Sequence, residues 1–395
     1  RCSLGAGLRE ATDLVFVLMP PGSVPAVSVS LSEIRMDATI VVLPGDGIGP
    51  EVISAAERVL NAVAKRAGHT FTLTSHLIGG AALRAGHPPL PDQTRDACLA
   101  ADAVLLGAVG DPAFDTGPSE GRPETALLQL RQALGVFANL RPARVWPGLE
   151  GGGAFKPERV AGADMLIVRE LIGGIYYGDP RGISDDRQSA WNTMRYSRPE
   201  IERIAEIAFE SAAGRRGLVT SVDKANVLET SRLWREVVTE VGERYPGVTL
   251  EHQYVDSCAL LLATNPKQFD VVLSGNLFGD ILSDEAGAVV GSLGLLPSAS
   301  LGGRGGLFEP VHGSAPSIAG QDIANPIGAI ASAAMLLRHA LGAGTEAAAV
   351  EQAIGDTLAE GYRTTDLVTD RPVTPISGST MTQKILIQVA ARLPA

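Results

Sequence analysis

Two aspartates, Asp280 and Asp284, lie four residues apart in the apolar segment 273–284 of this sequence. If that segment is helical, both carboxylates lie on one face about one turn apart, where like charges repel each other. The sequence from Gln268 to Gly303 contains no Lys or Arg, so the local sequence supplies no cation. A divalent metal would neutralise the pair, since hard cations bind carboxylate oxygens. The alternative is an ordinary solvated helix face.

Three arginines are expected at the ends of elements. Arg131 lies in a helix that we expect to begin at Glu124, Arg141 follows an extended piece, and Arg169 ends a strand. The guanidinium fork binds carboxylates with two hydrogen bonds. The three arginines therefore indicate recognition of a small acid with more than one carboxylate. The alternative is three unrelated surface arginines.

The elements around these residues alternate between short apolar strands and helices of ten or more residues, which predicts an α/β fold. The expected strands are 38–43, 103–107, 165–169, 217–224, 249–255 and 270–275. The expected helices are 50–66, 124–134, 199–216, 325–341, 345–361 and 381–392. Thr380 and Gln383 fit a capping box for the last helix.

A glycine-rich loop, Pro44–Glu51, follows the first expected strand. Its glycines are spaced G-x-G-x-G, which matches neither the dinucleotide-binding fingerprint nor a P-loop. A tight turn between strand and helix explains the glycines at least as well as phosphate binding does. The sequence therefore does not predict a Rossmann fold.

Composition narrows the class of protein. The chain has 395 residues, of which 45% are hydrophobic and 19% charged, which is typical of a globular protein with room for two domains. A net charge of −11 argues against non-specific nucleic-acid binding. Apolar runs fall short of the roughly 20 residues that cross a membrane. Three cysteines without C-x-x-C spacing predict neither a disulfide scaffold nor a zinc site, so we expect a cytoplasmic protein.

Residues 1–35 differ from the rest of the chain. They begin with Arg1 and include a Pro/Ser/Val-rich piece at 20–25, and Met36 directly precedes the first expected strand. We expect this stretch to be a non-native or disordered extension. A targeting peptide is the alternative, but several acidic residues and few arginines fit it poorly.

Seven motifs in this order resemble the β-decarboxylating dehydrogenases, the family of the isocitrate and 3-isopropylmalate dehydrogenases. They are Leu43–Val52, Ala138–Pro142, Val168–Tyr176, Val222–Val227, His252–Asp256, Gly275–Asp284 and Glu309–Pro316. The resemblance runs from about residue 37 to the end. It implies an α/β fold of two domains, with the second inserted into the first. Residues 37–136 and 291–395 would then bind the cofactor, and residues 137–290 would form the metal site and the homodimer.

The resemblance also implies roles for residues. Mg²⁺ or Mn²⁺ would bind Asp280 and Asp284 of one subunit and Asp256 of its partner. Asp256 would also contact the substrate. Lys224, again from the partner, would take the hydroxyl proton, and Tyr176 would protonate the enolate left by CO₂. Substrate carboxylates would be held by Arg131, Arg141 and Arg169.

For the cofactor, the resemblance implies NAD, held by the loop that follows residue 311, with Glu124 near the nicotinamide. The expected loop residues are His312, Gly313, Ser314, Ala315, Pro316, Ser317, Ile318 and Asn325. Two positions depart from the family pattern. Ser317 replaces an aspartate that would bind the ribose hydroxyls, which predicts some use of NADP. The loop Gly110–Asp115 also differs from the usual sequence, so its contacts to the nicotinamide are not carried over.

Within the family, the substrate is expected to follow the residues that meet its variable group. Leu127, Leu128 and Val227 are apolar, and a leucine would desolvate a carboxylate without giving it a partner. The resemblance therefore implies oxidation and decarboxylation of (2R,3S)-3-isopropylmalate to 4-methyl-2-oxopentanoate, in leucine biosynthesis. One alternative is a related enzyme for tartrate, malate or homoisocitrate. Another is a non-catalytic regulatory subunit, but such a chain would be expected to lack a metal aspartate, the lysine or the tyrosine.

Overall fold

The structure is a computed structural model of the chain that describes residues 35–114, 116, 121–151, 153, 155–303, 305–368 and 373–393. Residues 35–395 form one compact unit. The expectation about the N-terminal extension concerns residues that, apart from Arg35, lie outside this described part. Among the described residues, no helix is long and apolar enough to cross a membrane.

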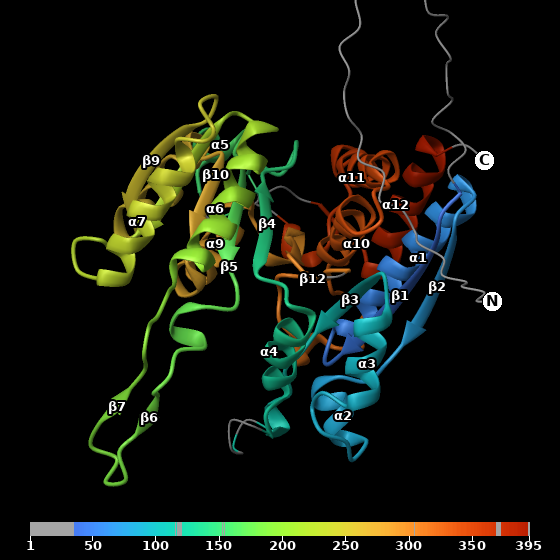
Figure 1. Cartoon of the computed structure of the whole chain (residues 1–395). Coiled ribbons are helices and arrows are strands. Elements are labelled where there is room, and N and C mark those ends of the chain that lie inside the picture. The colour runs from blue at the N-terminus through green and yellow to red at the C-terminus, as the bar shows by residue number, and fades with distance from the viewer. Residues whose placement is uncertain are drawn as a thin grey trace, which may run out of the picture. The chain divides into compact units, whose positions relative to one another are not determined.

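A ten-stranded sheet runs through the unit (Figure 1) in the order β2-β1-β3-β12-β11-β4-β5-β10-β8-β9. Its strands are β1 (Asp37–Gly45), β2 (Thr70–Ser75), β3 (Ala103–Ala108), β4 (Ala138–Arg144), β5 (Asp164–Glu170), β8 (Leu218–Asp223), β9 (Thr249–Tyr254), β10 (Val271–Ser274), β11 (Pro297–Leu301) and β12 (Leu307–Pro310). Most neighbours are parallel, but β11 is antiparallel to both β12 and β4, and β4 is antiparallel to β5. This mixed order confirms an α/β fold that is not a Rossmann fold.

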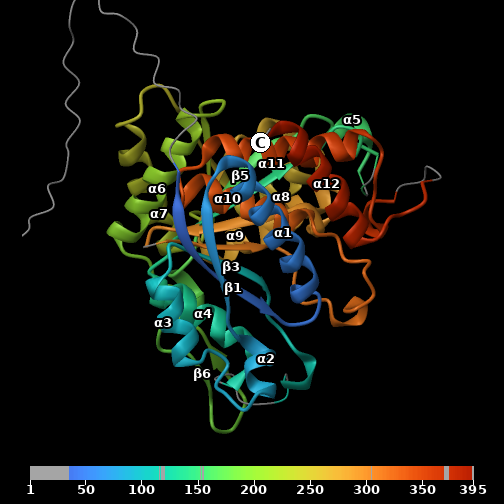
Figure 2. The same ribbon diagram turned by 90° about the vertical axis from the view of Figure 1, so that its right-hand side faces the viewer.

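Helices cover the sheet. They are α1 (Gly49–Ala67), α2 (Gly79–Arg84), α3 (Asp92–Ala100), α4 (Pro123–Leu134), α5 (Pro157–Val160), α6 (Arg198–Ala213), α7 (Glu229–Gly242), α8 (Val255–Thr264), α9 (Asn276–Val290), α10 (Ile327–His339), α11 (Gly344–Ala359) and α12 (Gly378–Arg392). Figure 2 shows α1, α10, α11 and α12 grouped beside β1 and β3. A short hairpin, β6 (Gly182–Ile183) and β7 (Ala190–Trp191), extends away from the large sheet in Figure 1.

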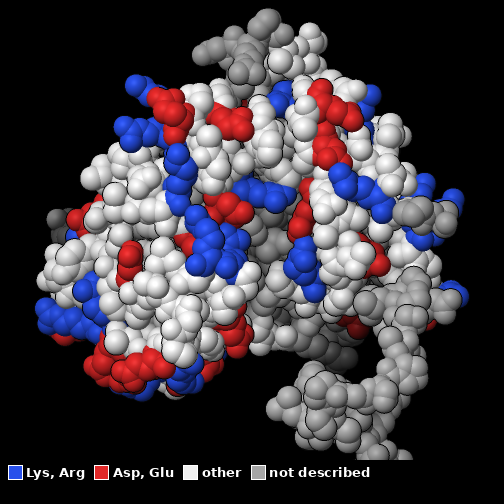
Figure 3. All heavy atoms as spheres, turned by 90° about the horizontal axis from the view of Figure 1, so that it is seen from above, with Lys and Arg blue, Asp and Glu red and all other residues white. Residues whose placement is uncertain are grey.

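The core follows from the apolar runs that define the strands. Ile40, Val42 and Leu105 are fully buried in the sheet, and they pack with apolar residues of α1 and α10. Cys98 and Cys258 are buried free thiols. On the face seen in Figure 3, acidic and basic side chains lie interspersed, without a large area of one charge.

The glycine-rich loop is a tight turn. Gly45 and Gly47 have φ of 71° and 56°, and a Cβ at either position would lie 1.9 Å from a backbone oxygen, so only glycine fits. The Asp46 carboxylate accepts hydrogen bonds from the backbone N–H groups of Gly80, Ala81 and Gly110, at 2.7–3.0 Å. Its negative charge makes the loop unsuited to phosphate, so the turn interpretation holds.

The start of the last helix differs from the prediction. We expected Thr380 to cap a helix beginning at Met381, but α12 begins at Gly378 and Ser377 is its N-cap. The Ser377 hydroxyl accepts a hydrogen bond from the Thr380 N–H at 3.2 Å. The capping-box prediction was therefore wrong, because the helix starts three residues earlier than its apolar pattern indicates.

Candidate active site

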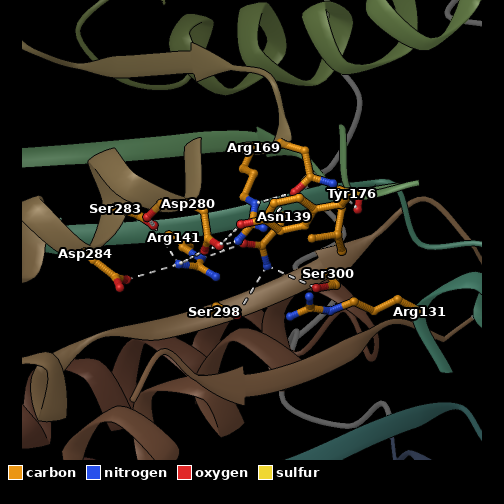
Figure 4. Close-up of polar contacts among 12 residues, drawn as sticks. Arg131, Asn139, Arg141, Arg169, Tyr176, Asp280, Ser283, Asp284, Ser298 and Ser300 are labelled. Atoms are coloured by element: carbon orange, nitrogen blue, oxygen red, sulfur yellow. Dashed lines mark hydrogen bonds and ion pairs between the residues drawn. The ribbon is translucent and has the colours of Figure 1, made fainter. Parts of the chain in front are cut away.

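Four elements bring the three arginines together. Arg131 lies in α4, Arg141 in β4 and Arg169 near the end of β5, and α9 runs beside them with the two aspartates (Figure 4). Gly279 makes this approach possible, because a Cβ there would lie 2.9 Å from the Arg169 side chain. The prediction that these residues belong to one site is consistent with this arrangement.

The arginines are not surface residues, since Arg131, Arg141 and Arg169 are 8%, 7% and 2% exposed. Arg131 forms a buried ion pair with Glu309 at 2.8 Å, while its Nε has no hydrogen-bond partner among the described residues. Burial, with the nearby Arg141 adding to its effect and Asp280 opposing it, lowers the pKa of Arg169 to about 10. Burial also lowers the pKa of Arg141. Such a cluster favours an anionic ligand.

Asp280 and Asp284 share one face of α9, as predicted. Asp280 contacts Arg169 directly and lies 3.5 Å from Arg141, and Asp284 lies 3.7 Å from Arg141. Burial raises the pKa of Asp280, but Arg169 and Arg141 outweigh it and leave the pKa below its usual value. For Asp284, burial raises the pKa, and the neighbouring Asp280 adds to the rise.

The local sequence around the two aspartates did not reveal which groups face them. The local sequence lacks cations, but β4 and β5 supply two of them from more than 100 residues away. Repulsion between the two aspartates does not by itself require a metal. The case for a metal rests instead on Asp284, whose side chain is 61% exposed and lies 3.7 Å from Arg141.

Tyr176 lies beside this cluster. Its hydroxyl donates a hydrogen bond to Asp280 Oδ2 at 2.8 Å, and burial together with that bond raises the pKa of Tyr176. The phenol therefore keeps its proton at neutral pH, as a proton donor must. Gly173 and Gly174, which lead into Tyr176, are buried, and the carboxylate of Glu170 accepts a hydrogen bond from the Gly173 N–H at 2.8 Å.

Lys224 and Asp256 form a second group. Lys224 Nζ donates to Asp256 Oδ1 at 2.5 Å, and Asp256 lies in the first turn of α8. Val227 follows nearby and is 62% exposed. Within the described part of the chain, no three His, Cys, Asp or Glu side chains are close enough to hold a metal ion. The structure thus does not bring Asp256 to Asp280 and Asp284 within one subunit.

The predicted apolar contacts lie on α4. Leu127 and Leu128 are half-buried, and Leu127 packs against a core cluster that includes Leu130. Both therefore retain apolar surface next to the buried Arg131.

The expected cofactor loop meets α4 at Gly110. An added Cβ at Gly110 would lie 3.2 Å from both Glu124 Oε1 and Ser314 Oγ, so these two predicted residues converge on it. Ala315 has a φ of 37° and helps to turn the loop back. Asp115, the end of the unusual loop, lies outside the described residues.

The rest of the loop is tied to the body of the protein. Ser314 O accepts from the Ile48 N–H at 2.8 Å, which joins the loop to the glycine-rich turn. Asn325 Nδ2 donates to Asp366 at 3.0 Å. Burial lowers the pKa of His312, and its Nε2 has no partner among the described residues. That buried, unpaired nitrogen suits a loop that receives a polar ligand. The remaining predicted loop residues, Gly313, Pro316, Ser317 and Ile318, are exposed or half-buried.

Three further polar residues of the site were not predicted. Asn139, Asn276 and Glu309 are each less than 10% exposed, and each contacts one of the arginines. All three lie inside motifs that carried the resemblance. The signal available in the sequence was a polar residue in the same motif as a predicted site residue. Only the fold reveals which arginine each of these residues contacts.

Comparison with known proteins places this site in a family of enzymes. Residues 39–385 match the family described as isocitrate/isopropylmalate dehydrogenase, and the chain belongs to that family. Two curated relatives named 3-isopropylmalate dehydrogenase are similar to most of the chain. The one from Salinibacter ruber is 60% identical, covering 83% of this chain and 89% of its own. The one from Nitratidesulfovibrio vulgaris is 56% identical, covering 84% and 94%.

A solved structure agrees with this assignment. The isocitrate dehydrogenase from Methylococcus capsulatus is 35% identical and superposes with a TM-score of 0.79, covering 89% of this chain and 99% of that one. The expected fold is confirmed by this likeness.

Proposed function

We propose that this chain oxidises and decarboxylates (2R,3S)-3-isopropylmalate to 4-methyl-2-oxopentanoate, with reduction of NAD, in leucine biosynthesis. The observation that carries the proposal is the pairing of Leu127 and Leu128 with the buried Arg131 on one surface of α4. A substrate with an isopropyl group beside a carboxylate matches such a surface. Curated relatives at 51–60% identity carry the name of this activity.

Charge favours a dicarboxylate. Three arginines meet in the site, and the carboxylates that pair with them are the buried Glu309 and the partly exposed Asp280 and Asp284. With a divalent cation on Asp280 and Asp284, the positive charge of the arginines would be left for a substrate, and among the described residues Arg131 Nε is a donor without a partner. Because the guanidinium groups are buried and already oriented, they bind a carboxylate with little loss of side-chain entropy.

Asp280 and Asp284 would hold Mg²⁺ or Mn²⁺ together with Asp256 of the partner subunit. Their oxygens suit a hard cation, and the exposure of Asp284 leaves it free to bind. A divalent cation held there would withdraw electrons from the oxidised substrate and so favour loss of CO₂.

The proton steps fall to two side chains. Lys224 of the partner subunit takes the proton of the substrate hydroxyl while the hydride passes to NAD. Tyr176 then protonates the carbon from which CO₂ has departed. The phenol is protonated at neutral pH, so it has a proton to give. The Tyr176 hydroxyl already lies among the groups that would surround the substrate.

NAD would bind along the loop from His312 to Asn325, with its nicotinamide near Glu124. The convergence of Glu124 and Ser314 at Gly110 supports this path. Ser317 carries no negative charge, so the site would repel the 2′-phosphate of NADP less than an aspartate does. We therefore expect NAD to be preferred, with measurable use of NADP.

A homodimer with shared sites completes the proposal. Large apolar side chains are exposed on α8 and α9, with Leu260 64% and Ile281 57% exposed. Burial of such residues in a subunit interface would stabilise a dimer and could bring Lys224 and Asp256 to the other subunit's aspartates. The sheet supports the expected domains, since its two halves come from 37–108 with 297–310 and from 138–274. Cytoplasmic location remains part of the proposal.

The test is NADH formation by purified protein with Mg²⁺ and NAD, comparing 3-isopropylmalate with isocitrate, malate and tartrate. A strong preference for 3-isopropylmalate that a chelator abolishes is the expected result. A faster rate on isocitrate would show that Leu127 and Leu128 do not meet the variable group. Absence of turnover on every acid, with folded protein, would favour a regulatory subunit.

A further inference from the structure

Two asparagines in the site contact the substrate arginines and have no role in the proposed reaction. Asn139 lies in β4 and Asn276 is the first residue of α9, and they are 0% and 1% exposed. Asn139 Oδ1 accepts from Arg141 Nε at 2.7 Å. Asn276 Oδ1 accepts from Arg169 Nε and Nη2 at 3.1 and 2.7 Å.

Their neighbours fix the orientation of both carboxamides. Asn276 Nδ2 donates to the carbonyl oxygens of Leu171 and Gly173, at 2.8 and 3.1 Å. Asn139 Nδ2 donates to the hydroxyls of Ser300 and Ser298, at 3.0 and 3.3 Å. Figure 4 shows Asn139 between Arg141 and these two serines. A guanidinium only donates and a carbonyl only accepts, so in each asparagine the oxygen must face the arginine.

A carboxamide and a carboxylate would act differently here. Either group can fix the direction of a guanidinium by accepting from its Nε. A carboxylate, however, adds a negative charge that opposes the binding of a second anion. Arg141 and Arg169 meet the carboxylate of Asp280 through Nη1, but the oxygen atoms that fix the Nε of these two arginines belong to neutral amides.

We propose that Asn139 and Asn276 are positioning residues that hold Arg141 and Arg169 in place without adding a negative charge to those of Asp280 and Asp284. This inference rests on the proposed function, in which both arginines bind substrate carboxylates. Asn276 also ties Arg169 to the turn at Gly173 that leads to Tyr176. It therefore links the acid-binding group, the proton donor and the helix of the two aspartates.

Asn139→Asp is the sharpest test. The hydroxyls of Ser298 and Ser300 can rotate to donate to a carboxylate, and Arg141 Nε can continue to donate. The variant therefore keeps the shape and the hydrogen bonds and adds one charge. We expect KM for the acid substrate to rise by about tenfold or more, with KM for NAD nearly unchanged, because the added charge lies next to an arginine for the acid. Asn265→Asp makes the same chemical change at an exposed position and should leave both KM values unchanged.

Two more variants keep the proposal open to refutation. Asn139→Ser removes the carboxamide without adding charge, so KM for the acid should rise less than in Asn139→Asp. If Asn139→Asp does not fold, a folded Asn139→Ser variant with the kcat and KM of the native protein overturns the proposal. In Asn276→Asp, the carboxylate would face the carbonyls of Leu171 and Gly173, so we expect kcat to fall as well, through displacement of Tyr176.

The result is separable from the proposed function. All variants are measured with whichever acid the native protein oxidises fastest, so another preferred dicarboxylate would refute the substrate but not the role of the asparagines. A folded Asn139→Asp variant with native KM for that acid would overturn the inference even if the substrate is 3-isopropylmalate.

Discussion

At the scale of single residues, Glu170 shows how the site depends on a buried charge. It follows Arg169 at the end of β5 and is completely buried, and its carboxylate accepts from the N–H groups of Ile172 and Gly173. Burial raises its pKa to about 7, against the opposing effects of these two bonds and of Arg203. Arg203, at 3.6 Å, is the cation that faces it, and Glu200 adds to the rise.

This shift predicts a pH-dependent stability. The folded state holds the Glu170 proton more tightly than the unfolded state, so the stabilisation is complete below the ordinary pKa and is lost as pH rises to about 7. Between about pH 5 and 8 the free energy of unfolding of the native protein should fall by on the order of 3 kcal/mol more than that of Glu170→Gln. Urea unfolding at fixed protein concentration and a series of pH values measures, for the native protein and for Glu170→Gln, the slope of the free energy of unfolding against pH. Parallel slopes would show that Glu170 does not titrate in this range.

Ser317 supports a prediction about the cofactor. A carboxylate at this exposed position would repel a 2′-phosphate and accept hydrogen bonds from ribose hydroxyls. Ser317→Asp should therefore raise the ratio of kcat/KM for NAD over NADP by about tenfold, which corresponds to about 1.4 kcal/mol. Ser317→Ala, which adds no charge, is the matched control. An unchanged ratio in Ser317→Asp would place the ribose away from this loop position.

At the scale of elements, the start of α12 is held by its cap. Ser377 accepts from the Thr380 N–H, and Asp322 in the cofactor loop accepts from the Ser379 N–H at 2.7 Å. Ser377→Ala should lower the free energy of unfolding by about 1 kcal/mol, the usual cost of losing an N-cap. Thr380→Ala should cost less, because Thr380 is an exposed residue inside the helix. A larger loss of unfolding free energy in Thr380→Ala than in Ser377→Ala would instead support Thr380 as the N-cap, as the sequence pattern predicts.

The same contrast shows what sequence could predict about elements. The run from Ala38 to Leu43 is apolar and β-branched, so its identity as a buried strand is local information. The N-cap of α12 is not local information, because serine and threonine are both suitable capping residues and either Ser377 or Thr380 could begin the helix. The position at which the helix begins decides between them. The strand β11 (Pro297–Leu301) was not predicted at all, since its small residues lack a strand pattern.

Local sequence also could not predict the partners in the site. Asp280 and Asp284 were recognised from their spacing, which a helix preserves. The cations beside them, Arg141 and Arg169, come from strands that precede α9 by more than 100 residues. Only the order of strands in the sheet places β4 and β5 next to α9, and that order depends on contacts between distant parts of the chain.

At the scale of the whole molecule, the proposed machinery is split between two places. Tyr176, Asp280 and the three arginines form one group, and Lys224 with Asp256 forms another. The described residues contain no cluster that joins them into a metal site. If a second subunit supplies Lys224 and Asp256, each active site needs both chains, and a lone subunit is inactive.

Mixing two inactive variants tests this division. In the proposed arrangement, Lys224→Ala would remove the base that a subunit gives to its partner, and Asp284→Asn would remove a metal ligand that the subunit keeps for itself. Dimers of either variant should be inactive. In a mixed dimer, one site has both defects and the other has neither, so random reassembly of equal amounts should restore about a quarter of native activity. If Lys224 served its own subunit, every site in the mixed dimer would carry one defect and no activity would return. A mixture of Lys224→Ala with Lys224→Met, which cannot complement in either arrangement, is the control for incomplete inactivation.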